Sequence, residues 1–136
     1  MKELAVMLRV LQIYAHQAHQ VVGRVVFVQD HEMLADIYTA AEKDYDDVIE
    51  RIIGLMGEEN IPSMQEISQN IAGLPGIEKE NSAYFEKILQ IEKGICAHIE
   101  MLAKSEQITQ GTLQLIGDIC NRLEKEQYKI KRRLKK

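Results

Sequence analysis

"FVQDHEMLADIYTAAEKDYDDVIERIIGLM" (residues 27–56) is the longest periodic segment of the chain, and it constrains the architecture more than any other. Gly57 and Pro62 follow the segment and end its pattern, because proline is not tolerated in a helix interior. Apolar residues recur in it at steps of three and four, so we predict one long helix with a single apolar face. That face contains Leu34, Ile37, Ala41, Val48, Ile52 and Leu55.

Three further periodic segments flank this helix. They cover about Lys2 to His19, about Lys79 to Lys104 and about Thr109 to Leu134, and each has apolar residues at helical spacing. Gly23 ends the first of them. Two prolines and eight glycines are too few for the many turns of an all-β fold. The chain is therefore predicted to be all-α.

The long connection between the second and third long helices is predicted to contain a short helix. "SMQEISQNIAGL" begins at Ser63 and has Glu66 three residues later, which is the pattern of a capping box. "GLPG" (residues 73–76) then breaks the chain. Four long helices with one long connection predict a four-helix bundle, folded as a single domain over residues 1–136.

Composition and charge exclude several classes of protein. The 136 residues suffice for one hydrophobic core, and the net charge of −4 argues against a globally basic nucleic-acid-binding protein. Charged residues in the first turns argue against a signal peptide, and no apolar run reaches the roughly 18 residues of a membrane span. Cys96 and Cys120 fit neither a disulfide framework nor a CxxC metal site, so we expect a cytoplasmic location.

One face of the residue 27–56 helix carries potential metal ligands. At about 100° per residue, Asp46 lies about 60° and Glu50 about 100° around the helix axis from His31. One stripe therefore has a histidine at one end and two carboxylates at the other. His31 and Glu50 are roughly 28 Å apart along the axis, so they cannot bind the same ion within one chain.

Two copies of this helix, packed antiparallel about a two-fold axis, would bring these side chains together. Residue 31 of one copy would lie opposite residue 50 of the other, and residue 35 opposite residue 46, because both pairs of numbers sum to 81. His19, at the end of the first helix, would swing in beside His31. Imidazole nitrogen and carboxylate oxygen together suit iron or zinc. The alternative is that all four side chains are simply solvated.

Spacings along the whole chain point to one protein family. A histidine lies twelve residues before a second histidine that is followed by glutamate, and an Asp-x-x-x-Glu-Arg motif precedes a Leu-x-Gly stop: His19, His31, Glu32, Asp46, Glu50 and Arg51. The C-terminal half adds Thr112, the run Leu123-Glu124-Lys125 and the aromatic Tyr128. Together these features resemble the Dps family, the miniferritins named for DNA protection in starved cells.

The resemblance implies a ferritin-like four-helix bundle that assembles from two-fold dimers into a hollow dodecamer. Such proteins bind Fe(II) between subunits, oxidise it, preferentially with hydrogen peroxide, and store ferric mineral inside. Carried over to this chain, the iron ligands and catalytic residues would be His19 and His31 from one subunit and Asp46 and Glu50 from its mate. An intra-bundle di-iron centre is not expected, because no histidine of the chain has glutamate three residues before it.

Two departures from the family pattern bear on this site. Ala35 replaces the usual Asp four residues after the second histidine, and the neighbouring Asp36 points about 100° away. Gln20 stands where the family has Trp. Losing one carboxylate predicts weaker metal binding or a site for a single iron.

The C-terminal "KIKRRLKK" has two interpretations. Its six basic residues would bind DNA phosphates, or they would simply complement the helix dipole at a helix end. They are Lys129, Lys131, Arg132, Arg133, Lys135 and Lys136. Two alternatives to iron storage therefore stay open: a Dps-shaped shell that acts mainly by binding DNA, associated with the nucleoid, and a helical interaction module that forms no cage.

Overall fold

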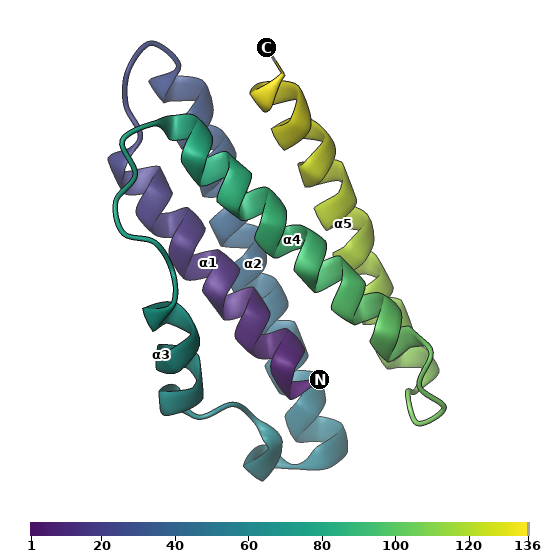
Figure 1. The fold of residues 1–136 in the computed structure, drawn as a ribbon. Coiled ribbons are helices and arrows are strands. Elements are labelled where there is room, and N and C mark those ends of the chain that lie inside the picture. The colour runs from purple at the N-terminus through teal and green to yellow at the C-terminus, as the bar shows by residue number, and fades with distance from the viewer. Residues whose placement is uncertain (136) are drawn as a thin grey trace.

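A computed structural model of the chain describes residues 1–135, and this part is entirely helical apart from turns and loops (Figure 1). The all-α prediction is confirmed there. Lys136, the last residue of the predicted DNA-binding segment, lies outside the described residues. The elements are α1 (Lys2–Val21), α2 (Phe27–Met56), the 3-10 turn η1 (Glu58–Asn60), α3 (Met64–Ala72), α4 (Asn81–Ala103) and α5 (Gln110–Leu134).

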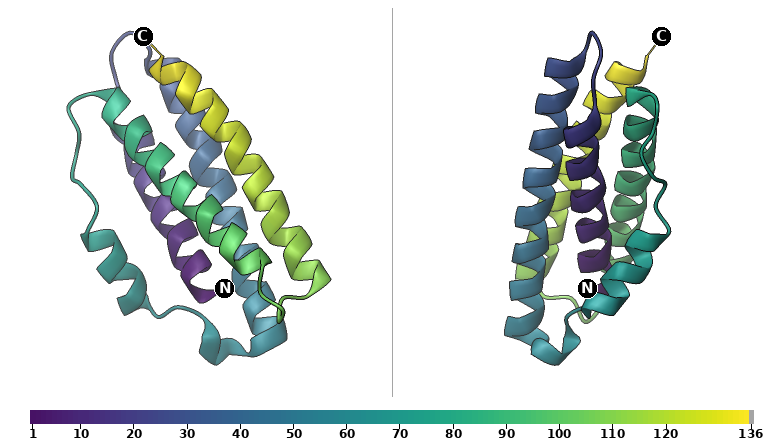
Figure 2. Two further views of the ribbon diagram at one scale, coloured as in Figure 1. Left: turned by 45° about the vertical axis from the view of Figure 1, so that its right-hand side comes forward. Right: turned by 90° about the vertical axis from the view of Figure 1, so that its left-hand side faces the viewer.

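The four long helices form two antiparallel pairs, α1 with α2 and α4 with α5 (Figures 1 and 2). The connection that contains α3 returns along the length of the bundle, so α2 and α4 run in the same direction. The end of α1, the starts of α2 and α4 and the end of α5 therefore meet at one end of the molecule. The end of α2 and the α4–α5 loop lie at the other end.

Local sequence signals set the ends of the helices. The predicted bounds of α2 agree with the structure, and α1 continues two residues beyond the predicted end. The Ser63 hydroxyl accepts from the Glu66 amide at 3.1 Å, and the Glu66 carboxylate accepts from the Ser63 amide at 3.0 Å, which confirms the capping box. Thr109 caps α5 in the same way, accepting from the Thr112 amide at 3.1 Å.

The core lies between the apolar faces of the four long helices. Burying a leucine or isoleucine side chain stabilises the fold by about 1.5–3 kcal/mol, so these faces supply most of the driving force for helix packing. The apolar residues that are at most 2% exposed include Leu8, Leu11, Leu34, Ile37, Phe85, Ile88, Ile95, Ile116 and Leu123.

The prediction that Leu55 belongs to this core is wrong. Its side chain is 56% exposed. α2 has 30 residues and α1 has 20, so the last turns of α2 extend beyond the helix against which it packs (Figure 2). Leu55 repeats with the correct period, but it lines a pocket at the end of the bundle, together with Met1 and Ile108, instead of packing in the core.

Within residues 1–135, none of the helices is long and apolar enough to cross a lipid bilayer.

Candidate metal centre

His19 and His31 lie side by side at the end of the bundle where α1 finishes and α2 begins. His19 is in the last turn of α1, and the chain reverses through residues 22–26 before α2 starts at Phe27. Arg24 adopts a φ of 70° in this reversal, a left-handed conformation that is uncommon for a side-chain-bearing residue. The short connection therefore brings together two histidines that are twelve positions apart in sequence.

The two imidazoles hold each other through reciprocal hydrogen bonds. Nδ1 of His19 lies 2.8 Å from the carbonyl oxygen of His31, and Nδ1 of His31 lies 2.8 Å from the carbonyl oxygen of His19. The rings stack at 3.6 Å between centroids, with 23° between their planes. A carbonyl oxygen can only accept, so each Nδ1 must carry the proton. In the neutral rings, both Nε2 atoms then have a free lone pair.

This arrangement is the one that metal-binding histidines usually show. Such a histidine donates its second ring N–H to a carbonyl or carboxylate, which fixes the ring and leaves the other nitrogen to bind the metal. Here both rings are fixed in this way, by backbone atoms of the two helix ends. Two imidazole nitrogens are thus available together, and the pair supplies half of a four-coordinate shell.

Aromatic side chains surround the pair. Phe27 packs against His31 at 4.9 Å between ring centroids, and Tyr38 presents an edge to His19 at 5.2 Å. His16 stacks on Tyr38 at 4.1 Å and is 6.3 Å from His19. These contacts restrict the positions of the two imidazoles from the α1 side and the α2 side, and both imidazoles are half-buried.

Asp46 and Glu50 do not approach the histidines within the chain. Both are exposed on α2, one turn apart and several turns beyond His31. Among residues 1–135, no group of three or more His, Cys, Asp or Glu side chains is close enough to hold a metal ion. The single chain therefore presents two imidazoles at one place and two carboxylates at another.

No family model and no curated protein matches this chain.

The basic residues at the end of α5 differ in their surroundings. Lys129, Lys131, Arg132 and Lys135 are exposed. Arg133 instead forms an ion pair with Asp30, with Nε 2.8 Å from Oδ1. Its guanidinium is therefore already neutralised inside the protein.

A second polar cluster lies inside the bundle, between α2, α4 and α5. Arg122 forms a forked ion pair with Asp44 and also contacts Glu126, with 3.2 Å between its Nε and Oε1. Glu92 is fully buried next to Glu126, and burial, helped by that neighbouring carboxylate, raises the pKa of Glu92 to about 10. Glu92 is thus protonated at neutral pH. The Arg122 guanidinium neutralises Asp44 within this cluster. Because the ion pair joins α5 to α2, the cluster has a structural role.

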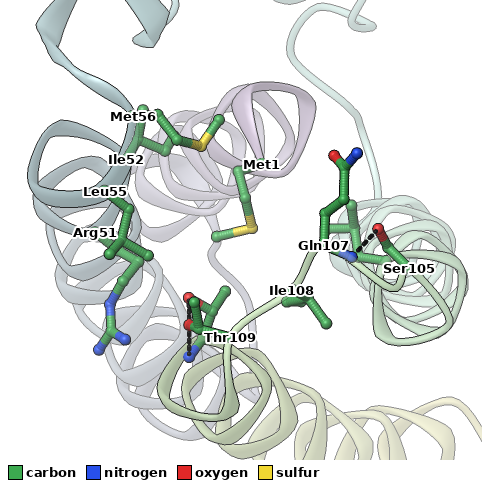
Figure 3. Close-up of a pocket in the computed structure, with 11 residues that line it drawn as sticks. Met1, Arg51, Ile52, Leu55, Met56, Ser105, Gln107, Ile108 and Thr109 are labelled. Carbon is green, nitrogen blue, oxygen red and sulfur yellow. Dashed lines mark hydrogen bonds between the residues drawn. The ribbon is translucent and has the colours of Figure 1, made fainter.

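A pocket lies at the opposite end of the bundle from the imidazoles (Figure 3). It has a volume of about 410 Å³ and is lined by the start of the chain, the last turns of α2 and the α4–α5 loop. The Met1 side chain points into it, whereas the Arg51 guanidinium points away (Figure 3). Its described lining contains no imidazole, thiol or carboxylate, so it offers none of the side chains that suit iron or zinc.

Proposed function

We propose that this protein is a Dps-like, cytoplasmic iron-binding and iron-storage protein that oxidises Fe(II) with hydrogen peroxide or oxygen at a site shared by two subunits. The observation that carries the proposal is the reciprocally hydrogen-bonded His19–His31 pair, which leaves two Nε2 lone pairs side by side. Each ring donates through Nδ1, which fixes the imidazole and leaves Nε2 as the nitrogen that can bind a metal.

The outer face of α2 supports a two-fold partner with the same sequence. In the antiparallel register that brings Asp46 and Glu50 to the histidines, paired residue numbers sum to 81. Val28 and Ile53 also sum to 81, lie on the same helix face as Asp46, and are 59% and 43% exposed. The register inferred from the ligands thus also covers two exposed apolar residues. Further apolar side chains are exposed at both ends of α2. They are Val25, Val26 and Phe27 at its start and Leu55 and Met56 at its end.

The topology of the bundle also supports the proposal. A four-helix bundle with one long crossover connection is the arrangement of ferritin-like proteins. In this chain the crossover carries α3 and places α2 parallel to α4. α2 keeps its acidic face exposed, free for a second copy.

In the proposed dimer, each subunit supplies a different half of the site. His19 and His31 donate two neutral nitrogens, and the partner's Asp46 and Glu50 donate two anionic oxygens that balance the charge of Fe(II), which is the substrate. Two Fe(II) ions supply two electrons that, together with two protons, reduce one hydrogen peroxide to two water molecules, so iron oxidation also removes peroxide.

Iron loading tests this function. Fe(II) and hydrogen peroxide are added to the full chain, Fe(II) loss is followed with a colorimetric chelator, and particle mass is measured by sedimentation. Fe(II) loss faster than in protein-free buffer and soluble ferric particles are expected, and the double variant His31→Ala/Asp46→Ala should reduce the rate to that of buffer and abolish the particles. Asp36→Ala is the matched control, because Asp36 is exposed on α2 but outside the proposed site. A wild-type protein that oxidises Fe(II) no faster than buffer does, or that sediments as one chain, contradicts the proposal.

Mixed dimers test whether the site is shared. His31→Ala chains and Asp46→Ala chains are each expected to be inactive, because each lacks one ligand in every site. A dimer of one chain of each kind has one intact site, so an equal mixture should regain about a quarter of the wild-type sites. Activity in either variant alone, or no recovery on mixing after joint refolding, would argue against a site shared between subunits.

The second candidate function is a Dps-shaped shell that acts mainly by binding DNA. It is favoured by Ala35, which removes a metal ligand that the family has, and by the exposed Lys129, Lys131, Arg132 and Lys135 at one helix end. Assembly would multiply a weak contact, since many such ends on one particle bind together. This candidate predicts binding to DNA without fast iron oxidation.

A further inference from the structure

Asp30 is a charged residue in the first turn of α2 and is only 1% exposed. Burying a carboxylate is unfavourable unless other groups neutralise it and bind both of its oxygens. Arg133, in the last turn of α5, does so with a two-pronged contact: Nε lies 2.8 Å from Oδ1 and Nη2 lies 2.9 Å from Oδ2. The start of α2 is thereby tied to the end of α5.

Asn81, the first residue of α4, ties in a third segment. Its Nδ2 donates to Oδ2 of Asp30 at 2.9 Å and to the carbonyl oxygen of Gly23 at 2.8 Å. The Gly23 amide in turn donates to Oδ1 of Asn81 at 3.4 Å. One amide side chain thus joins the α1–α2 connection to the buried carboxylate at the start of α2.

These contacts involve residues that are close in sequence to the two imidazoles. Asp30 immediately precedes His31, and Gly23 is four residues after His19. Each imidazole donates to the backbone carbonyl of the other histidine, so ring orientation depends on how the end of α1 sits against the start of α2. Within the described α1–α2 connection, the only other side-chain hydrogen bond to another segment is the ion pair of Arg24 with Glu80. Both of these side chains are largely exposed, so their ion pair contributes little to stability.

We propose that Asp30, Asn81 and Arg133 form a polar clamp that positions the His19–His31 pair, so that the end of α5 controls the metal-binding geometry. The three are positioning residues, because they contact the helix ends and the connection while the imidazoles bind the ion. The metal-binding consequence rests on the proposed function, whereas the effect on the imidazole geometry does not. Arg133 consequently supports the metal site. The basic residues at the end of α5 that are exposed for phosphate binding are then Lys129, Lys131, Arg132 and Lys135.

The inference is tested by nitrogen NMR of the imidazoles in the metal-free full-length protein. The Nδ1-protonated form gives distinct signals for its two ring nitrogens, and wild-type His19 and His31 should both show it. Arg133→Gln and Asn81→Ala are expected to convert both residues to the averaged signals of a free imidazole. Arg132→Gln, an exposed change in the same turn, should leave them unchanged.

A second control separates positioning from general destabilisation. Arg122→Gln breaks the other forked ion pair of the bundle, with Asp44, away from the imidazoles. It should lower thermal stability but preserve the paired imidazole signals. Arg133→Gln leaves the buried Asp30 carboxylate without its cation, so this variant can fail to fold. In that case Asn81→Ala tests the inference, because it removes the hydrogen bonds between Gly23 and Asp30 but leaves the Asp30–Arg133 ion pair intact.

Co(II) titration, followed by its visible spectrum, then measures the effect on metal binding. Asn81→Ala and Arg133→Gln should weaken Co(II) binding by about 10-fold to 100-fold, the usual cost of losing outer support around a metal site. Unchanged imidazole signals in folded Asn81→Ala overturn the clamp, and so does an unchanged Co(II) affinity beside a wild type that binds. A wild type that binds no Co(II) overturns the proposed function instead, and the metal-free NMR still decides whether the clamp positions the pair.

Discussion

Glu92 is the residue whose chemistry departs most from its ordinary behaviour. It is fully buried beside Glu126, and burial followed by the effect of that neighbour raises its pKa to about 10 from an ordinary value of 4.5. Between these two pH values the folded protein keeps a proton that the unfolded chain releases. Stability from this group is fully present below about pH 4.5 and is lost as pH rises towards 10.

Glu92→Gln should therefore stabilise the protein at alkaline pH. An amide has a similar shape and cannot ionise, so we expect the free energy of unfolding at pH 8 to rise by about 1–3 kcal/mol. The gain should shrink towards pH 4, where the wild-type carboxyl group is neutral in both states. Urea unfolding across this pH range measures it, with the exposed Glu86→Gln on the same helix as control. A pH-independent difference would mean that Glu92 does not carry the proton.

Ala35 lies at the proposed iron site, at a position where the Dps pattern behind the proposal has an aspartate. It lies one turn after His31 on α2 and is half-buried. Ala35→Asp should tighten Co(II) binding by about tenfold, since a third carboxylate adds both a ligand and a negative charge to the site. Position 35 faces the partner's Asp46 in the proposed register, so the same change should weaken the metal-free dimer. Titration and sedimentation measure the two effects, and an unchanged metal affinity would place residue 35 outside the site.

At the scale of helices, local signals set the boundaries. Thr109 caps α5 by accepting from the Thr112 amide and by donating its hydroxyl hydrogen to the Thr112 hydroxyl at 2.8 Å. Thr109→Ala should lower the free energy of unfolding by about 1 kcal/mol, the usual cost of losing an N-cap side chain. Thermal unfolding checks this, with the exposed Gln110→Ala next to it as control. Equal stability of the two variants would show that the cap contributes nothing.

The sequence predicted the helices well because each helix is specified by nearby residues. Periodicity gave the apolar faces, and Gly57 and the Ser63–Glu66 capping box marked ends that the structure confirms. Pairing of the two histidines also followed from a short connection. The single chain tests neither their metal nor the partner's carboxylates, so those parts of the site stay predictions.

The buried polar contacts were missed because their partners are far away in sequence. Asp30 and Asp44 fall on the apolar face of α2, and Glu92 falls on that of α4, which signals a buried charge. The same pattern does not identify the cation that neutralises the buried charge. Arg133 is 103 positions from Asp30, and only the folded bundle brings the two together.

At the scale of the assembled molecule, the exposed apolar residues of α2 would decide which surface pairs in the proposed dimer. Ile53→Lys should weaken the dimer by at least tenfold, because it places an ammonium group against Val28 of the second copy. Adding Val28→Glu to it should restore the dimer, since opposite charges then face each other across the two-fold axis. Sedimentation equilibrium measures both, and Met101→Lys, an exposed change on α4, is the control. Failure of the double variant to recover contradicts the register.

In the DNA-binding candidate function, the acidic net charge of the chain limits where the proposed particle would contact DNA. With a net charge of −4, the phosphate contacts must be concentrated in a basic region, and the end of α5 provides one. Lys131→Gln/Arg132→Gln/Lys135→Gln should weaken DNA binding and lower the slope of log affinity against log salt by about 0.9 for each phosphate that the variant no longer neutralises. Lys79→Gln/Lys87→Gln/Lys93→Gln removes the same charge around α4 and should change the slope less. Fluorescence anisotropy across a salt series separates the two variants. Equal slopes would show that DNA responds only to the total charge of the particle and that the α5 end forms no specific phosphate contact.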